Sequence, residues 1–400
     1  MRIGNGGTTG ALNPATDISI ASEATFGVNR SNAVVQGTDF SGNPLTGDGN
    51  FAQRGTGSTT LNLANTYAGT TTVDAGALLV EHASALGTTA GGTVVNGTTS
   101  SGSANARLEL TGGVTVTGES LTISGSGSFL GALTSTSGNN VWAGPVTIGA
   151  SGTRLGASPG ASLEVSGVID SGAVATGLII RPNDLTGSVI LSGANTYLGT
   201  TQVLIGVLQL AGGDNRLPVG TTLNLGSSSS NPGAEFDLNG RNQEVAGLEL
   251  SGSADPTKNT INNSSGTPST LTVNTPAATP STFAGILTGN LSIAKSGPDT
   301  LSLTGTSNAY TGNTTVNEGT LSLSGINPSN ESSTVTIAAS GATLDLGFAG
   351  TDTVDQLFIG ATQMAAGVYG PSATDIPQIT GTGTLTVTTG PVTDPFADWA

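Results

Sequence analysis

The sequence predicts an all-β protein folded as a parallel β-helix, or β-solenoid. Three observations indicate this fold: a composition rich in glycine and threonine, a period of two between apolar and polar residues, and a motif that recurs three times. Gly contributes 62 and Thr 63 of the 400 residues. Because glycine and β-branched threonine are poor helix formers, a mainly helical chain is excluded.

The first recurring element has the pattern Tyr-x-Gly-x-Thr-x-Val-x-x-Gly-x-Leu, which we call the Tyr module. Its copies are separated by long segments of unequal length, and each Tyr follows an Asn by two positions (Asn65, Asn195 and Asn308). The motif residues are Tyr67, Gly69, Thr71, Val73, Gly76 and Leu78; Tyr197, Gly199, Thr201, Val203, Gly206 and Leu208; and Tyr310, Gly312, Thr314, Val316, Gly319 and Leu321. Such self-similarity is typical of repeat architectures.

A second recurring element follows each Tyr module after a connecting segment, with an acidic residue between two apolar ones. The three acids are Glu109, Asp237 and Asp345, and we interpret them as outward, solvated side chains. A basic residue also precedes each Tyr at a similar distance along the chain: Arg54, Arg181 and Lys295. We expect these three to neutralise carbonyls or acids at a repeated corner.

Apolar residues alternate with Thr, Ser or Asn within both elements, which predicts short strands with one buried face. A β-sandwich would close within about 250 residues, so a stack of turns accounts better for the whole length. At about 20 to 25 residues a turn, the chain would make about 16 to 20 turns. We expect one continuous β-helix over 1–400, cut at both ends, with internal units near 1–81, 82–211, 212–324 and 325–400.

The charge balance limits the partners. A net charge of −16 with 10 basic residues argues against nucleic acid and against anionic membranes. There is no Cys and one His, so neither a disulfide nor a Cys/His zinc cluster can form. No apolar run approaches the length of a membrane helix, so this segment is not expected to insert in a membrane. We predict no cofactor, no metal site and no catalytic residue.

Three groups of side chains have alternative interpretations. His82 is expected in a solvated turn, because no partner for catalysis is marked near it. The acids are scattered, although facing turns of a β-helix could bring two carboxylates to the spacing that a glycosidase needs. Tyr67, Tyr197 and Tyr310 could stack on sugars along the molecule or pack the corner of each module, and the repeated neighbours favour packing.

The Tyr module resembles the autotransporter-associated β-strand repeat of passenger domains and very large secreted proteins of Gram-negative bacteria, including verrucomicrobia and planctomycetes. The segment 283–301 resembles the stretch that leads into that repeat, and 367–387 resembles the end of such a repeat region. The second copy departs from the family at Leu204 and Ile205, which suggests a packed turn. The resemblance implies a right-handed, single-stranded β-helix, export and surface display, and no catalytic residues.

These observations predict a structural, surface-display rod of a secreted or cell-surface bacterial protein. Adhesion is the specific role considered for this rod. The alternative is a carbohydrate-active β-helix enzyme, a polysaccharide lyase or glycosidase, or a polysaccharide-binding module. The expected partners are an extracellular polysaccharide or the surface of a host or neighbour, together with end-to-end self-association of the fragment through its cut ends. We expect attachment to the outer membrane through a region beyond this sequence.

Overall fold

The computed structural model describes residues 1–99, 105–172, 175–182, 184–230, 232–327, 331–371 and 376–392. These residues form 42 short β-strands and two 3-10 segments, η1 (Gly127–Phe129) and η2 (Pro256–Lys258), with no α-helix in the described ranges. Nearly all strand pairs are parallel, and each strand pairs with the strand one turn later. The predicted all-β parallel solenoid is therefore confirmed.

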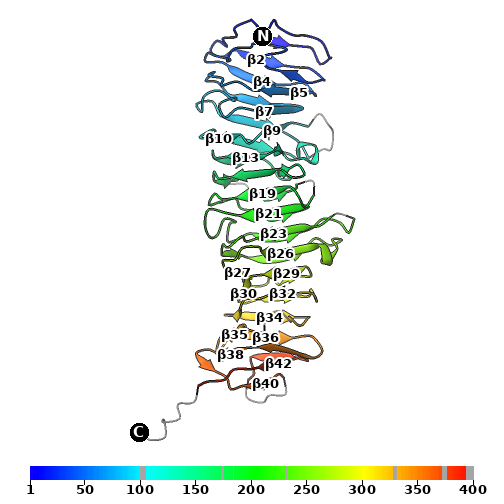
Figure 1. Cartoon of the computed structure of the whole chain (residues 1–400), viewed down its shortest axis with the longest axis vertical. Helices are drawn as coiled ribbons and strands as arrows, with labels where there is room; N and C mark the ends of the chain where they lie inside the picture. The colour runs from blue at the N-terminus through cyan, green and yellow to red at the C-terminus, as the bar shows by residue number, and fades with distance from the viewer. Residues whose placement is uncertain are drawn as a thin grey trace, which may run out of the picture. The chain divides into compact units, whose positions relative to one another are not determined.

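The chain contacts divide it into two units. Unit 1 holds Met1–Pro218 with Pro232–Ala234, and unit 2 holds Val219–Asn231 with Glu235–Ala400. Unit 1 has three stacks of strands, several of which are labelled in Figure 1. Its first sheet is β1 (Arg2–Ile3), β2 (Thr25–Val28), β4 (Asn50–Gln53), β6 (Thr71–Val73), β8 (Thr93–Asn96), β11 (Leu121–Ser124), β14 (Val146–Ile148) and β17 (Ile169–Asp170). Its second sheet is β3 (Val34–Val35), β5 (Ser58–Leu61), β7 (Ala77–Val80), β9 (Arg107–Thr111), β12 (Leu133–Ser137), β15 (Arg154–Ala157), β18 (Leu178–Ile180) and β20 (Thr201–Val203). Its third sheet is β10 (Thr115–Val116), β13 (Asn139–Trp142), β16 (Ser162–Val165), β19 (Ser188–Leu191) and β21 (Gly206–Leu210).

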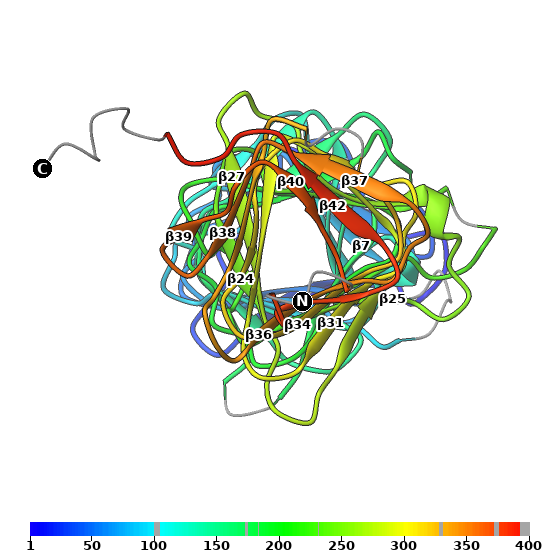
Figure 2. The same ribbon diagram turned by 90° about the horizontal axis from the view of Figure 1, so that it is seen from below.

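Unit 2 repeats this plan, and its sheets form three sides around a core in Figure 2. One side is β22 (Thr222–Leu225), β25 (Gly247–Leu250), β28 (Ser281–Phe283), β31 (Thr300–Leu303), β34 (Gly319–Leu323), β36 (Ala342–Leu346) and β41 (Ile379–Gly381). The next is β24 (Gln243–Val245), β27 (Ser269–Asn274), β30 (Leu291–Ser296), β33 (Thr314–Val316), β35 (Thr334–Ile337), β38 (Gln356–Ile359) and β39 (Thr362–Gln363). The remaining strands are β23 (Ala234–Asp237), β26 (Asn259–Asn263), β29 (Ile286–Gly289) and β32 (Ala309–Tyr310), and then β37 (Thr351–Val354), β42 (Thr384–Val387) and β40 (Gly367–Tyr369).

The core of each unit is built of columns of apolar side chains, in which each sheet contributes residues from successive turns. In unit 1, Leu78 pairs with Leu108, which pairs with Leu133 on the next turn, and all three are fully buried. In unit 2, Leu301 and Leu321 pair in the same way. Burial of each such side chain stabilises the fold by about 1.5–3 kcal/mol. The alternation of buried and partly exposed residues along the strands places one apolar face inward, as the period of two predicts.

The number of turns differs from the prediction. The described part of the chain makes about 15 turns, because a few turns are much longer than the range assumed from the sequence. Among the short turns is the one that leads from Thr59 to its partner Leu78. A much longer turn leads from Leu344 to its partner Ile379. Loops at the corners, and in the last turn the additional strands β39 and β40, account for the extra length. Loop length is only weakly penalised in the free energy of folding.

The last strands of unit 2 change direction. Strand β39 pairs antiparallel with β38, and β40 pairs antiparallel with β42. A short antiparallel strand ends the parallel ladder of the sheet that it joins.

Candidate functional site

The three tyrosines of the Tyr modules lie inside the solenoid. Tyr67, Tyr197 and Tyr310 are at most 2% exposed. In each copy the hydroxyl shares a hydrogen bond with the Oγ1 atom of the Thr four positions later, at 2.6, 2.6 and 2.8 Å. Burial raises the pKa of all three hydroxyls. The rings are covered by protein, so they offer no surface on which a sugar could stack.

Each module also buries the Asn that precedes its Tyr, and two of these amides join three successive turns. The Asn65 side chain accepts a hydrogen bond from the Leu45 N–H at 2.8 Å and donates one to the Ala85 carbonyl at 2.7 Å. Leu45 lies one turn before Asn65, and Ala85 lies one turn after it. Asn195 does the same with Ile169 and Arg216, at 2.8 Å each.

The third Asn makes a shorter link. Asn308 accepts from the Leu287 N–H of the preceding turn at 3.0 Å and donates to the Gly305 carbonyl of its own turn at 3.0 Å. The sequence shows that an Asn recurs two positions before each Tyr, but it predicts no role for this residue. The fixed position of the Asn is the only sign in the sequence of the links between turns.

The second glycine of each module has a left-handed backbone. The φ angles of Gly76, Gly206 and Gly319 are +64°, +84° and +69°, where a side chain is disfavoured. A Cβ atom on Gly76 would lie 2.1 Å from the Gly57 carbonyl oxygen. The module glycines Gly69, Gly199 and Gly312 are equally confined, since a Cβ atom on each would lie within 2.5 Å of an atom of the preceding turn.

The remaining motif residues form the inner face. Val73, Val203, Val316, Leu78, Leu208 and Leu321 are fully buried. In the second copy Ile205 is 5% exposed, so the turn that departs from the family pattern is packed. Thr71, Thr201 and Thr314 are buried as well, at 2% exposure or less. The alternation along the strands predicts threonine mainly on the outside, and these three are exceptions because each satisfies a buried tyrosine hydroxyl.

The three repeated basic residues do not occupy one corner, contrary to the prediction. Lys295 is inside: its Nζ atom donates to the carbonyls of Ser296 and Gly297 at 2.7 Å and to that of Glu318 at 3.1 Å. Burial lowers the pKa of Lys295 to about 8, although the charges of Glu318 and Asp299 oppose this shift. The strand register explains why the similar spacing from each basic residue to its Tyr does not place the three side chains at one corner. Lys295 pairs with Val316 as Gln53 pairs with Val73, so Gln53 is the equivalent of Lys295.

Arg54 and Arg181 are one position past that inward place. Arg54 is exposed and lies 3.7 Å from an Asp74 carboxylate oxygen. Arg181 is half-buried and donates from Nη1 to the Phe129 carbonyl at 2.6 Å. A shift of one position along a strand moves a side chain to the opposite face. The distance from each basic residue to its Tyr differs among the three copies. That distance therefore does not reveal whether the side chain faces inward or outward.

The three repeated acids are not solvated alike, so their interpretation as solvated side chains is corrected for Glu109 and Asp237. Glu109 is 7% exposed and pairs with Arg107. Asp237 is 3% exposed and accepts hydrogen bonds from the backbone N–H groups of Asn239 and Ser264 and from the Ser264 hydroxyl. Asp345 is partly exposed and accepts from Ser322 and Thr380 of neighbouring turns. All three carboxylates are held by nearby polar groups of the protein, and those of Glu109 and Asp237 are also shielded from water.

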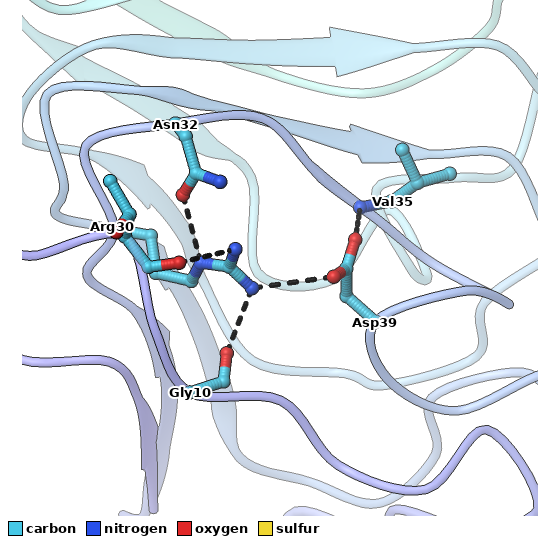
Figure 3. Close-up of polar contacts among 6 residues, drawn as sticks. Gly10, Arg30, Asn32, Val35 and Asp39 are labelled. Atoms are coloured by element: carbon cyan, nitrogen blue, oxygen red, sulfur yellow. Dashed lines mark hydrogen bonds and ion pairs between the residues drawn. The ribbon is translucent and has the colours of Figure 1, made fainter.

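A buried arginine ties the N-terminal loop of unit 1 to the first turns, as Figure 3 shows. Arg30 is 7% exposed. It donates from Nε to Asn32 Oδ1 at 3.0 Å, from Nη1 to the Gly10 carbonyl at 2.9 Å, and from Nη2 to the Thr8 carbonyl at 2.8 Å. Asp39 completes the cluster at 3.3 Å from Nη1. All these groups satisfy one another, so the cluster is structural.

The described residues offer few side chains that are arranged to act in catalysis. His82 is half-buried, and its Nδ1 atom accepts from the Ser84 N–H at 3.1 Å, which fits the solvated turn expected for it. Across the described ranges no group of three or more His, Asp or Glu side chains is arranged to hold a metal ion. Three hollows in unit 2 have volumes of about 580, 380 and 220 Å³, and their lining includes one ionisable side chain, Glu249.

One buried acid in unit 2 responds to pH. Burial raises the pKa of Asp352 to about 6, the charge of Glu331 adds to this, and backbone N–H groups of Asn327 and Thr353 oppose it. In the unfolded chain the same carboxyl titrates near pH 4. Between about pH 4 and 6 the folded state therefore holds a proton that the unfolded state has lost. The stabilisation is full below pH 4 and is lost as the pH rises through 6.

We therefore expect Asp352→Asn to make unit 2 more stable than the parent at pH 7, by about 1–2 kcal/mol, and to leave the two equal at pH 3.5. Urea unfolding at both pH values measures this. Asp255→Asn is the control, because the pKa of the partly exposed Asp255 is lowered by hydrogen bonds from Thr257, and its loss should not stabilise the protein at pH 7. Equal effects of the two substitutions would contradict the assignment.

Comparison with known proteins bears on the modules directly. Residues 51–80, 186–210 and 293–323 match the family described as passenger-associated-transport-repeat. No curated protein matches the chain, and no solved structure does. The part of the chain that the structure describes has no helix with the length and apolarity needed to span a bilayer.

The matched segments correspond to a structural unit. Residues 51–80 run from β4 to β7, in which β4 pairs with β6 and β5 pairs with β7. Residues 293–323 run from β30 to β34, with β30 paired to β33 and β31 to β34. Each of these two matches thus contains two strands and the two strands that stack directly on them, whereas the match 186–210 contains β19 with its partner β21 and only the second strand of the pair β18 and β20. The resemblance seen in the sequence is confirmed, since three segments of the chain match a repeat family of autotransporter passengers.

Proposed function

We propose that this chain is a structural rod that a bacterium displays at its surface or secretes, in the manner of an autotransporter passenger. The observation that carries the proposal is the threefold match to the passenger repeat, in which strands of one turn stack on those of the next. Family membership of the repeats supports export and surface exposure. A stack of self-similar turns suits a spacer, because each added turn lengthens it without requiring a new core.

The use of polar groups inside the modules supports a structural role over an enzymatic one. The Tyr hydroxyls, the Asn amides and the Lys295 ammonium group all bond to the protein itself. Groups that are satisfied within the fold are not available to polarise or to protonate a substrate. We therefore propose no catalytic residue and no cofactor, and we propose an extracellular polysaccharide or a neighbouring surface as the partner.

The test combines scattering with a polysaccharide panel. We expect small-angle scattering of the isolated chain to give the profile of an elongated particle, and a profile of a compact sphere would contradict the rod. We expect the panel to show binding without cleavage of any polymer, which supports an adhesive rod. Turnover of a polymer would overturn the structural assignment in favour of a carbohydrate-active enzyme.

A second measurement addresses display. Antibodies raised against the chain should label intact cells that produce the protein, and external protease should remove the label. Labelling only after the cells are broken would contradict surface display.

A further inference from the structure

Two arginines of unit 1 lie close together on the outer side of its second sheet. Arg154 begins β15, next to the buried Leu155, and Arg181 follows β18 on the next turn. Strand pairing places Arg154 opposite Ile179, two positions before Arg181. Both arginines are half-buried.

An aromatic ring holds both guanidinium groups. The Cζ atoms of Arg154 and Arg181 lie 4.7 and 5.4 Å from the centroid of the Phe129 ring. Arg181 is fixed further by its hydrogen bond to the Phe129 carbonyl. Cation–π contacts position a guanidinium group without neutralising its charge.

The loop that presents Phe129 is strained. Ser128 and Phe129 have φ angles of +60° and +70°, a conformation that residues with a Cβ atom rarely adopt. Backbone strain of this kind persists where the surrounding structure imposes it, and it often accompanies binding sites.

The charge of the pair is not compensated by the protein. Within the residues that the structure describes, neither Arg154 nor Arg181 has a carboxylate within ion-pair distance, whereas Arg30, Arg54 and Arg107 each have one. The Arg154 side chain has no hydrogen-bond acceptor in those residues either, and its Nε atom is buried without a partner.

The two guanidinium groups also repel each other. Burial lowers the pKa of Arg154, and the charge of Arg181 lowers it further. The sequence has 26 acidic residues and a net charge of −16, yet no described carboxylate lies within ion-pair distance of either arginine to relieve this repulsion. A bound anion would relieve it, because a guanidinium group donates paired hydrogen bonds to carboxylate, sulfate or phosphate oxygens.

We propose that Arg154, Arg181 and Phe129 form a binding site for the oxyanion groups, carboxylate or sulfate, of an acidic polysaccharide. The anion site follows from the geometry alone, whereas the choice of a polysaccharide rests on the proposed surface display. The site lies on the outer side of a sheet, where a group carried on an extended polymer can reach it from solvent. Arg154 supplies the uncommitted donors, and Arg181 is already fixed by Phe129 and supplies the second charge.

Titration of the full chain with polygalacturonate, dextran sulfate and neutral dextran tests the site. We expect at least one of the two acidic polymers to bind and the neutral one not to bind. Arg154→Gln should weaken that binding at least fivefold, and it breaks no hydrogen bond of the described fold. The matched control is Arg54→Gln, which removes the same charge from an exposed side chain of the same unit and should change affinity less than twofold. Preference for polygalacturonate would identify a carboxylate group, and preference for dextran sulfate a sulfate group.

Two results would overturn the site: no binding of either acidic polymer, or equal weakening by Arg154→Gln and Arg54→Gln. Arg154→Lys is a second variant that keeps the charge but loses the paired donors, and binding unchanged by it would contradict recognition by the guanidinium group. Equally tight binding of duplex DNA would overturn the choice of a polysaccharide. If cell labelling shows that the protein is not displayed while Arg154-dependent binding of sulfate groups holds, the display role fails and the anion site stands.

Discussion

Gly76→Ala is expected to destabilise unit 1 by about 3–5 kcal/mol, an effect in the range that single substitutions reach only through a severe clash or strain. Two causes add. The φ angle of +64° disfavours any Cβ atom, and that atom would lie 2.1 Å from the Gly57 carbonyl oxygen and 2.5 Å from that of Gly55. Both oxygens belong to the preceding turn, so relief requires the two turns to separate. Urea unfolding followed by circular dichroism measures the loss.

Two other glycines of unit 1 separate these causes. Gly112 has a φ of +79° and no atom near its Cβ position, so Gly112→Ala should cost only the backbone strain, about 1–2 kcal/mol. Gly69 has an ordinary φ, but a Cβ atom there would lie 2.3 Å from the Gly49 carbonyl oxygen, so Gly69→Ala tests the clash alone. If Gly76→Ala cost no more than Gly112→Ala, close stacking of the modules would not be what selects glycine.

Asn65→Ala is expected to destabilise unit 1 by about 3–4 kcal/mol, because it leaves two buried backbone groups unsatisfied at about 1–3 kcal/mol each. These groups are the Leu45 N–H and the Ala85 carbonyl, and the substitution also removes the bonds between Asn65 and Gln36. Because the two groups lie on different turns, the loss should spread beyond the turn of Asn65, which hydrogen exchange of the Leu45 amide would report.

The control for this prediction is Asn96→Ala. Asn96 is exposed, and its amide bonds to the Asp74 carboxylate at 2.8 Å, so its loss should cost less than about 1 kcal/mol. Similar losses for the two asparagines would mean that the link between turns contributes little. Asn308→Ala should fall between them, because Asn308 joins only two turns.

The order of the strands follows from local patterns, and so the fold could be predicted from the sequence. Alternation such as Leu301-Ser302-Leu303 requires one buried face, and the repeated Tyr modules require that like turns stack on like. The number of turns could not be predicted as well, because a corner can absorb a long loop without disturbing the ladder. The turn from Glu249 to its partner Thr282, which has a loop with η2 between β25 and β26, shows this.

The placement of a module around the solenoid is also set by the tertiary structure. In unit 1 the first copy has its two strands, β6 and β7, in the first and second sheets. The second copy has β20 and β21 in the second and third sheets. The module has moved by one side between the copies, although its motif is the same. A motif determines the local backbone path at the corner that it forms. The number of residues between motifs determines at which of the three corners of the solenoid the motif lies.

The sequence by itself determined the all-β class, the parallel stacking and the three modules, since these depend on the period of two and on glycine at corners. Only the tertiary structure decided which polar residues are inside. Thr71 and Lys295 are buried because a tyrosine hydroxyl or a ring of carbonyls faces them, and Arg181 is outside because it lies one position past the inward place. At a corner the alternation of faces breaks, so a residue's side is set by its contacts with the turns before and after it, which a linear pattern does not contain.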